Sequence, residues 1–208
     1  MKLIDLKLNE YLDILLSDAP APGGGSVSAL AGAQGAALMA MVADLTTAKE
    51  KYAEDYETCK EAREKAGKLY TDFAAAIDED TEAFNLVAAA FKMPKETQDE
   101  KTARREAIAD GTLESTKVPF GVMKMAASGL KVAEMLVGHS NPNCGSDLGV
   151  GVLNLMTCMK GAWLNVKINL PGVKDEKLAS QYQEEGRKMM AEGEELAGRL
   201  YAEIEGSL

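Results

Sequence analysis

Three consecutive glycines and a serine stand directly before a long segment of small and apolar residues. Gly23, Gly24 and Gly25 have no side chains, so a ligand can lie against the backbone there. Ser26 is a good residue to cap a helix, and a helix start offers unpaired N–H groups that suit an anion or a carbonyl oxygen. The lysine of a phosphate-binding loop is missing. The pattern predicts a ligand-binding loop or, alternatively, a turn into a tightly packed helix.

Asp80 is predicted to lie among apolar side chains. It falls in the middle of a narrow helical stripe, because each residue of a helix turns by about 100°. Burial disfavours a charged carboxylate and raises its pKa, which suits a general acid or base that works near neutral pH. A structural carboxylate that caps a neighbouring helix, or pairs with a buried lysine, would show the same pattern. The apolar members of the stripe are Phe73, Ile77, Phe84, Val87 and Phe91.

Two further polar segments could contribute to a binding site. Lys49 and Tyr52 follow the small-residue segment, although a short charged run is usually only a solvated surface. Residues 139–151 form a polar loop that leads into another helix. The side chains of this loop can donate or accept hydrogen bonds, or cap the helix that follows. An ordinary loop would carry the same residue types, and we expect His139 to be exposed without a role. The candidate ligand contacts in this loop, which we expect to converge with the glycine loop, are Asn141, Asn143, Ser146 and Asp147.

The cysteines and the single histidine argue against two kinds of site. Cys59, Cys144 and Cys158 are an odd number without close pairing, which predicts no disulfide framework and fits a reducing cytosol. One histidine and the lack of a Cys-x-x-Cys motif argue against a zinc site. We therefore predict no metal.

The composition is that of a folded, acidic protein. Of its 208 residues, 46% are apolar and 27% charged, and we predict a single domain over residues 1–208. The net charge of −10 disfavours a nucleic-acid partner, because phosphate contacts need lysine and arginine. The N-terminus is too acidic for a signal peptide, and residues 27–43 are too short and too rich in glycine and alanine for a membrane span. We expect a cytoplasmic protein with no membrane partner.

Helical periodicity dominates the chain, so the predicted fold class is all-α, a bundle of long helices. Residues 27–45 carry small side chains on two faces, which predicts a central helix surrounded by others. Residues 52–91 predict a second long helix that ends before Pro94, because proline disfavours helix in the residue that precedes it. Further helices are expected over residues 147–165 and 175–205.

Two stretches are harder to interpret. A polar segment over residues 97–110 precedes a helix over residues 113–137, and Gly111 and Pro119 predict a kink or a break there. Apolar residues alternate over residues 164–170, which fits a short strand, but we favour the frayed end of a helix because no pairing partner is evident.

Four motifs follow one another along the chain. They are the PAPGGGS sequence that ends at Ser26, the Leu45-Thr46 pair with Lys49 and Tyr52, the DTEAF sequence that begins at Asp80, and the SDLGV sequence that begins at Ser146. Together they resemble the cyclodeaminase/cyclohydrolase family, which comprises the cyclodeaminase domain of formiminotransferase-cyclodeaminase and the stand-alone methenyltetrahydrofolate cyclohydrolases. The similarity runs from Leu3 to the last helix. Ala48 stands where the family usually has glycine, and Gly151 where it commonly has alanine.

The resemblance implies an all-helical homodimer that binds a tetrahydrofolate one-carbon derivative in a cleft, as substrate and without a permanently bound cofactor. Asp80 matches the carboxylate taken as catalytic in the family. The residues that match the ligand's surroundings are Gly23 to Ser26, Lys49, Tyr52 and the loop from Asn141 to Asp147.

The implied reaction is hydrolysis of 5,10-methenyltetrahydrofolate to 10-formyltetrahydrofolate. Two alternatives stay open: cyclodeamination of formiminotetrahydrofolate with release of ammonia, and a non-enzymatic helical dimerisation module. Folates carry glutamate carboxylates, so an acidic protein needs a local basic patch to bind them. We expect Lys49, Lys51 and the two helix starts to supply it.

Overall fold

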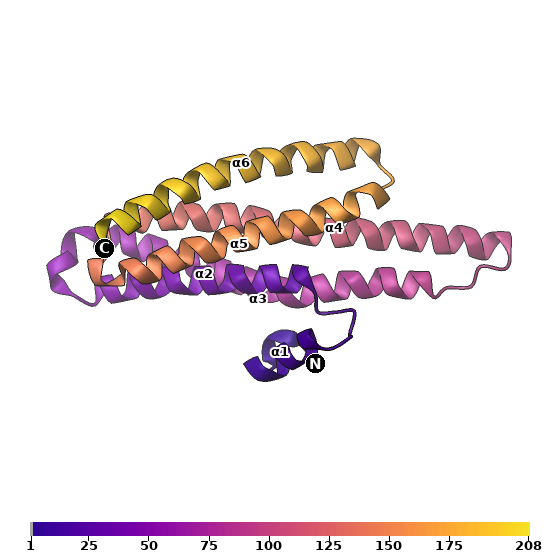
Figure 1. Cartoon of the computed structure of the whole chain (residues 1–208), viewed down its shortest axis with the longest axis horizontal. Helices are drawn as coiled ribbons and strands as arrows, with labels where there is room; N and C mark the ends of the chain where they lie inside the picture. Colours follow the sequence, from indigo (N-terminus) through magenta and orange to yellow (C-terminus); the bar gives the residue numbers. More distant parts are fainter. Residues whose placement is uncertain (1) are drawn as a thin grey trace.

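Long helices lie side by side in a bundle, and a short N-terminal helix lies apart from it (Figure 1). A computed structural model describes residues 2–208 of the chain, and in this range it contains six α-helices and no strand. The all-α prediction is therefore confirmed. The helices are α1 (Leu8–Leu16), α2 (Gly24–Thr47), α3 (Tyr56–Phe91), α4 (Gln98–Leu136), α5 (Gly145–Asn169) and α6 (Glu176–Ser207), with single-turn or short 3-10 segments at Leu3–Asp5, Glu50–Asp55, Pro142–Cys144 and Leu170–Gly172.

Helix α2 lies at the centre of the bundle and packs against α3, α4 and α5. Its small residues let the neighbours approach closely, since a Cβ at Gly32 would overlap the Phe73 ring and one at Gly35 would meet Leu155. The prediction that other helices surround α2 is wrong for one face, where Met41 and Leu45 are exposed. Helix α2 is also the one helix among residues 2–208 that is long and apolar enough to cross a membrane, but most of it is buried in the bundle.

Helix α4 is continuous from Gln98 to Leu136, so the chain does not break at Gly111 or Pro119. The polar segment that was expected to precede this helix is part of it. Its first turn is capped by Thr97, whose side chain accepts a hydrogen bond from the Glu100 N–H. Pro119 lacks the N–H that would bond to the Ser115 carbonyl, and Asn169 from α5 donates to that carbonyl instead (2.7 Å). A side chain from another helix therefore satisfies the group that the proline leaves unpaired.

The last two helices follow the sequence pattern. Residues 164–169 are helical, so the preferred interpretation of the alternating stretch is confirmed and the strand is wrong. Helix α6 is capped by Asp175, whose carboxylate accepts from the N–H groups of Lys177 and Leu178. Its apolar stripe faces the bundle, and Leu200 and Ile204 are buried.

The N-terminal arm, residues 2–16, is attached to α3. The carboxylate of Asp78 accepts a hydrogen bond from the Leu3 N–H at 2.5 Å. Tyr11 is the buried residue of α1, whereas Leu8 and Leu16 on the same short helix are largely exposed. The arm therefore touches the bundle through its first turn and through one inserted aromatic ring.

Candidate active site

Helix α3 places Asp80 against the first turn of α2. The Ser26 N–H donates to Oδ2 of Asp80 at 2.9 Å, and the Ser26 hydroxyl donates to the Ile77 carbonyl at 2.7 Å. The first N–H groups of a helix have no partner within that helix, so the carboxylate satisfies one of them. The prediction that Ser26 caps the helix is wrong: α2 begins at Gly24, and Asp80 supplies the acceptor from outside.

Gly25 is what allows this contact. A Cβ on Gly25 would overlap Oδ1 of Asp80, so any other residue would push the carboxylate away. The other two glycines differ, because Gly24 has the Asn165 amide at ordinary contact distance and Gly23 has nothing within 4 Å. Of the three glycines predicted to contact a ligand, Gly25 lies directly against Asp80. The space beside Gly23, where a Cβ would be, is open.

Burial raises the pKa of the half-buried Asp80 above its ordinary value, and the hydrogen bonds from Ser26 act in the opposite direction. A raised pKa makes this carboxylate a stronger base, which suits general acid–base catalysis. The carboxylate also fulfils the structural alternative, since it caps a neighbouring helix. Capping of α2 is compatible with a role as a base, because the Ser26 N–H bonds to Oδ2 and leaves Oδ1 for a proton.

The apolar stripe around Asp80 is buried over only half of its length. Phe73 and Ile77 are buried as predicted, but Phe84 is 38% and Phe91 58% exposed. The reason is that α2 begins beside Asp80. It covers the side of α3 that carries Phe73, which meets Gly32, but it does not extend past Asp80 to cover the rest of the stripe. The apolar stripe therefore buries Asp80 from one side only, because Phe84 and Phe91 on the other side are exposed.

Tyr11 is a site residue that sequence reasoning missed. Its side chain is 5% exposed, and its hydroxyl has no hydrogen-bond partner among the described residues. Burial and, to a smaller extent, the negative charge of Asp80 raise the pKa of Tyr11, so the hydroxyl is a neutral donor close to that carboxylate. The sequence offered no signal, because an aromatic residue among the leucines of α1 is typical of simple packing.

A second polar cluster forms around Asn141, which is buried. The Tyr52 hydroxyl donates to the Asn141 side-chain oxygen at 2.9 Å, and the Asn143 N–H donates to the same atom at 3.2 Å. The Asn141 N–H donates to the hydroxyl oxygen of Thr46, at the end of α2, at 2.9 Å. The structure thus brings together Tyr52, Asn141 and Asn143, which the family resemblance grouped among the residues around the ligand.

The remaining predicted contacts lie at the edge of this second cluster. Burial and the charge of Asp147 raise the pKa of Cys144 while the charge of Lys49 lowers it, which places both charged groups near that thiol. Ser146 is exposed, and α5 begins at Gly145 without a side-chain cap, so the expected capping by Ser146 and Asp147 is wrong.

His139 is exposed, as expected, but it is not without a partner. Its Nδ1 lies 2.9 Å from Oδ1 of Asp55, in the short helical segment before α3. The imidazole therefore helps to tie the loop before α5 to the start of α3.

The two clusters lie at opposite ends of α2. Helix α5 runs antiparallel to α2, since Gly24 faces Asn165, Gly35 faces Gly151, and Thr46 bonds to Asn141 (Figure 1). At about 1.5 Å per residue, the stretch of α2 from Ser26 to Thr46 separates the clusters by roughly 30 Å. The expected convergence of the two helix starts within one chain is therefore wrong.

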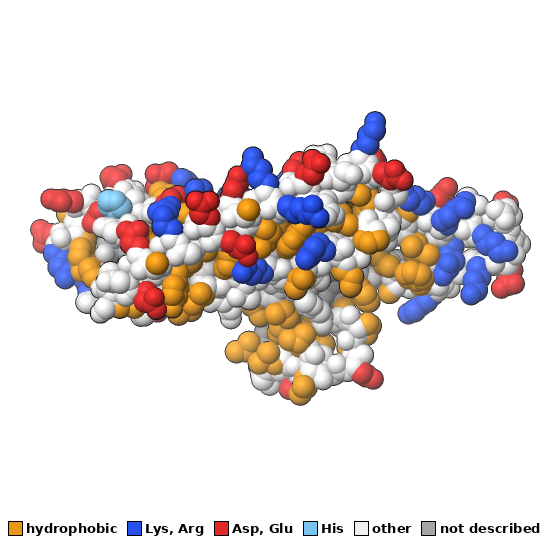
Figure 2. Space-filling model, turned by 45° about the horizontal axis from the view of Figure 1, so that its top comes forward, with side chains coloured by type: hydrophobic (Ala, Val, Ile, Leu, Met, Phe, Trp, Pro, Cys, Tyr) orange, Lys and Arg blue, Asp and Glu red, His pale blue; other side chains and the backbone are white. Residues whose placement is uncertain are grey.

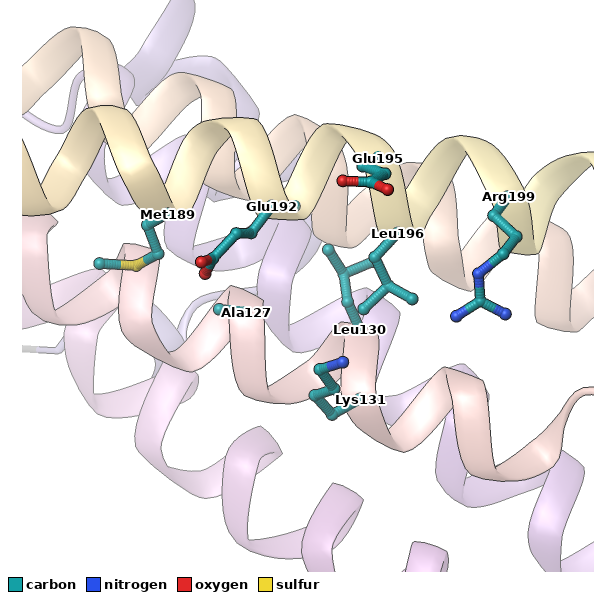
Figure 3. A pocket seen from close by; sticks show the side chains of 9 residues that line it. Ala127, Leu130, Lys131, Met189, Glu192, Glu195, Leu196 and Arg199 are labelled. Atoms are coloured by element: carbon teal, nitrogen blue, oxygen red, sulfur yellow. The ribbon is translucent and has the colours of Figure 1, made fainter.

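Two surface cavities differ in whether predicted site residues line them. A groove of about 330 Å³ lies between α4 and α6, where Lys131, Glu192 and Arg199 point into it (Figure 3), and no predicted site residue lines it. A smaller pocket of about 180 Å³ borders Asn141 and Gly145 beside the end of α6. Among residues 2–208, no three histidine, cysteine or carboxylate side chains lie together as a metal site would require.

A family model described as formiminotransferase-cyclodeaminase matches residues 7–188. The chain belongs to this family. It is 35% identical to the methenyltetrahydrofolate cyclohydrolase of Methylorubrum extorquens, over 97% of both chains. It is 29% identical to the formimidoyltransferase-cyclodeaminase of Gallus gallus over 98% of this chain, but it spans only 38% of that protein.

A solved structure shares the fold. The formiminotetrahydrofolate cyclodeaminase of Thermotoga maritima superimposes with a TM-score of 0.81 over 100% of this chain and 98% of that one, at 24% identity. The family resemblance read from the motifs is thus confirmed, and the relatives are named for cyclohydrolase and cyclodeaminase reactions on folate derivatives.

Proposed function

We propose that this chain is a methenyltetrahydrofolate cyclohydrolase. The observation that carries the proposal is the carboxylate of Asp80, held against Gly25 by the Ser26 N–H and with its pKa raised by burial. The similarity to the Methylorubrum extorquens cyclohydrolase, at 35% identity over 97% of both chains, supports this choice of reaction.

The chemistry follows from the substrate's own charge. The methenyl carbon lies between N5 and N10 and is cationic, so water can add to it directly. Ser26 occupies Oδ2 of Asp80, which leaves Oδ1 to accept the proton as the carbon–oxygen bond forms. When the carbon–N5 bond breaks, the protonated carboxyl returns this proton to N5. The new hydroxyl loses its own proton to solvent, and the formyl group stays on N10.

The second candidate is cyclodeamination of formiminotetrahydrofolate. In that reaction N10 attacks the formimino carbon and ammonia leaves, so the same tetrahedral carbon between N5 and N10 is formed. The fold shared with the Thermotoga maritima cyclodeaminase favours it, with a TM-score of 0.81. The higher sequence identity to the cyclohydrolase places it second.

We further propose that two copies pair to complete the site. Exposed apolar residues follow one face of α2 and α5 between the two polar clusters, which is unusual for a surface free in water. Antiparallel pairing through this face about a twofold axis would bring Asp80 of one protomer towards the partner's Asn141. The residues on this face are Val27, Met41, Leu45, Val150, Leu153, Leu164 and Ile168.

Because the substrate is itself cationic, the proposed reaction needs no permanently bound cofactor and no metal. The substrate is soluble, and we place the enzyme in the cytoplasm without a nucleic-acid or membrane partner.

The decisive assay follows the ultraviolet absorbance of 5,10-methenyltetrahydrofolate at a pH where spontaneous hydrolysis is slow. We expect the protein to accelerate its loss and Asp80→Asn to reduce this acceleration about a thousandfold. Ammonia release from formiminotetrahydrofolate without acceleration of the hydrolysis would make the cyclodeaminase the function. Inactivity on both substrates would favour a non-enzymatic dimerisation module.

A further inference from the structure

The end of the bundle where α3 turns into α4 carries positive charge on an otherwise acidic protein. We call residues 91–105 the α3–α4 tip. In a chain of net charge −10, these fifteen positions hold five cations against three carboxylates. Figure 2 shows the blue side chains gathered at this end of the molecule. The five cations are Lys92, Lys95, Lys101, Arg104 and Arg105.

These cations are available to a ligand. Ten lysines and arginines elsewhere form ion pairs, but within residues 2–208 none of the five tip cations lies within 4.0 Å of a carboxylate oxygen. The nearby carboxylate of Glu100 instead accepts from the N–H groups of Glu96 and Thr97 at the start of α4, both at 2.9 Å. The buried Nε of Arg104 also has no hydrogen-bond partner in the described chain.

An aromatic surface connects Asp80 to this tip. Phe84 and Phe91 are two of only four phenylalanines in the sequence, and both are exposed on the helical stripe that holds Asp80. The Arg104 guanidinium lies 5.4 Å from the centre of the Phe91 ring and donates to the Phe91 carbonyl at 3.3 Å. A carboxylate, two aromatic rings and a set of cations therefore follow one another along a surface of α3 that α2 does not cover.

This order matches the chemical order of a folate. The reacting carbon of a folate lies on the pterin, the aminobenzoyl ring follows it, and the glutamate carboxylates form the far end. At about 1.5 Å per residue, Phe84 lies roughly 6 Å and Phe91 roughly 16 Å along α3 from Asp80. An extended folate whose reacting carbon is at Asp80 can therefore reach the tip with its carboxylates.

We propose that the α3–α4 tip binds the glutamate tail of the substrate, with Phe84 and Phe91 against the aminobenzoyl ring and Lys101 and Arg104 on the carboxylates. The inference rests on the proposed function, because it takes a folate as the substrate. It adds a second basic surface to the expected patch, since Lys49 lies beyond the far end of α2 from Asp80 in the same chain and would reach Asp80 only from the partner in the proposed pair. Further glutamates on the tail add carboxylates, so the tip should favour polyglutamyl folates.

The test compares mono- and pentaglutamyl 5,10-methenyltetrahydrofolate as substrates. We expect the KM of the wild type to be about tenfold lower for the pentaglutamate, and this advantage to shrink as salt screens the charges. The double variant Lys101→Gln with Arg104→Gln should lose most of the advantage. The control Lys177→Gln with Arg187→Gln removes the same two residue types from α6, where neither forms an ion pair, and should keep it.

Equal KM values for the two substrates in the wild type, or an advantage that persists in the tip variant, would overturn the inference while the hydrolysis itself still stands. Equilibrium dialysis with mono- and pentaglutamyl tetrahydrofolate, which cannot react, separates the two proposals. Tighter binding of the pentaglutamate that depends on Lys101 and Arg104, in a protein without hydrolase activity, supports the tail site and rejects the proposed function. Equal binding of the two compounds rejects the tail site.

Discussion

The two polar clusters at the ends of α2 are built in different ways. Around Asn141, the amide, the Tyr52 phenol and the Thr46 hydroxyl satisfy one another through neutral hydrogen bonds. Around Asp80, a half-buried carboxylate has a raised pKa, and the nearby Tyr11 hydroxyl has no partner. A satisfied network stabilises a structure, whereas unsatisfied groups are kept for a ligand or a reaction. This difference supports the proposal that Asp80 carries the chemistry, and we propose that Asn141 shapes the binding site.

The largest effect should come from Asp80→Asn. We expect the rate of methenyl hydrolysis to fall about a thousandfold, because the amide cannot take a proton from water. Melting temperature at neutral pH should not fall, since the Asn side-chain oxygen can still accept from the Ser26 N–H. A large loss of stability with nearly full activity per folded molecule would instead assign Asp80 to the structural role of capping α2.

The pH dependence of stability sharpens this prediction. Because the folded pKa of Asp80 is raised, its contribution to stability is fully present below the unfolded pKa and is lost as the pH rises through the folded pKa. Relative to the wild type, Asp80→Asn should therefore be more stable at pH values above the folded pKa of Asp80 than at pH values below it. Thermal melts of both proteins from acidic to neutral pH measure this difference.

The next effect tests how the carboxylate is held. Gly25→Ala places a methyl group where Oδ1 of Asp80 lies, so we expect about a hundredfold loss of activity and a destabilisation of about 1–3 kcal/mol from overpacking. Gly23→Ala is the matched control, because nothing lies within 4 Å of the added Cβ. Equal activities of these two variants would contradict the arrangement described for Asp80.

A smaller effect is expected for Tyr11→Phe, which removes only the unpartnered hydroxyl. If this hydroxyl donates to the bound substrate or water, kcat/KM should fall about tenfold. The melting temperature should stay the same or rise, because no hydrogen bond within the protein is lost. A lower melting temperature with unchanged kcat/KM would mean that Tyr11 only packs the arm against the bundle.

Substitution in the Asn141 cluster should affect stability more than activity, the opposite of what we expect at Asp80. Asn141→Ala removes the acceptor of the Tyr52 hydroxyl and should lower the free energy of unfolding by about 1–3 kcal/mol, with only a severalfold rise in KM. Asn143→Ala is the control, since Asn143 takes part in the cluster through its backbone N–H. Denaturant unfolding and steady-state kinetics on both variants would show whether the division of roles between the clusters is correct.

Sequence patterns predicted the local parts of this molecule better than its long-range geometry. Helical periodicity identified α2, α3, α5, α6 and the second part of α4, but not α1. The position of Asp80 on an apolar stripe identified the carboxylate that meets Ser26. The continuity of α4 through Pro119 could not be predicted, because the Asn169 side chain that compensates it comes from a different helix. Periodicity also gives no information about where a neighbouring helix begins, so it could not show that Phe84 and Phe91, on the same stripe as the buried Phe73, are exposed.

The separation of the two clusters was missed for a related reason. Each helix start was identified from its own residues, but their distance depends on α5 running antiparallel to α2. Tyr11 was missed because only the folded arm brings α1 near Asp80. The relations between elements that are distant in the sequence are therefore what the structure adds.

The most direct test of the account is the pH profile of kcat/KM for 5,10-methenyltetrahydrofolate, corrected for spontaneous hydrolysis. We predict that activity rises with pH as one carboxyl ionises, with a midpoint above the ordinary aspartate value of 3.8. This rise should be absent from the residual activity of Asp80→Asn. A midpoint at or below 3.8, or the same rise in Asp80→Asn, would contradict the assignment of Asp80 as the base.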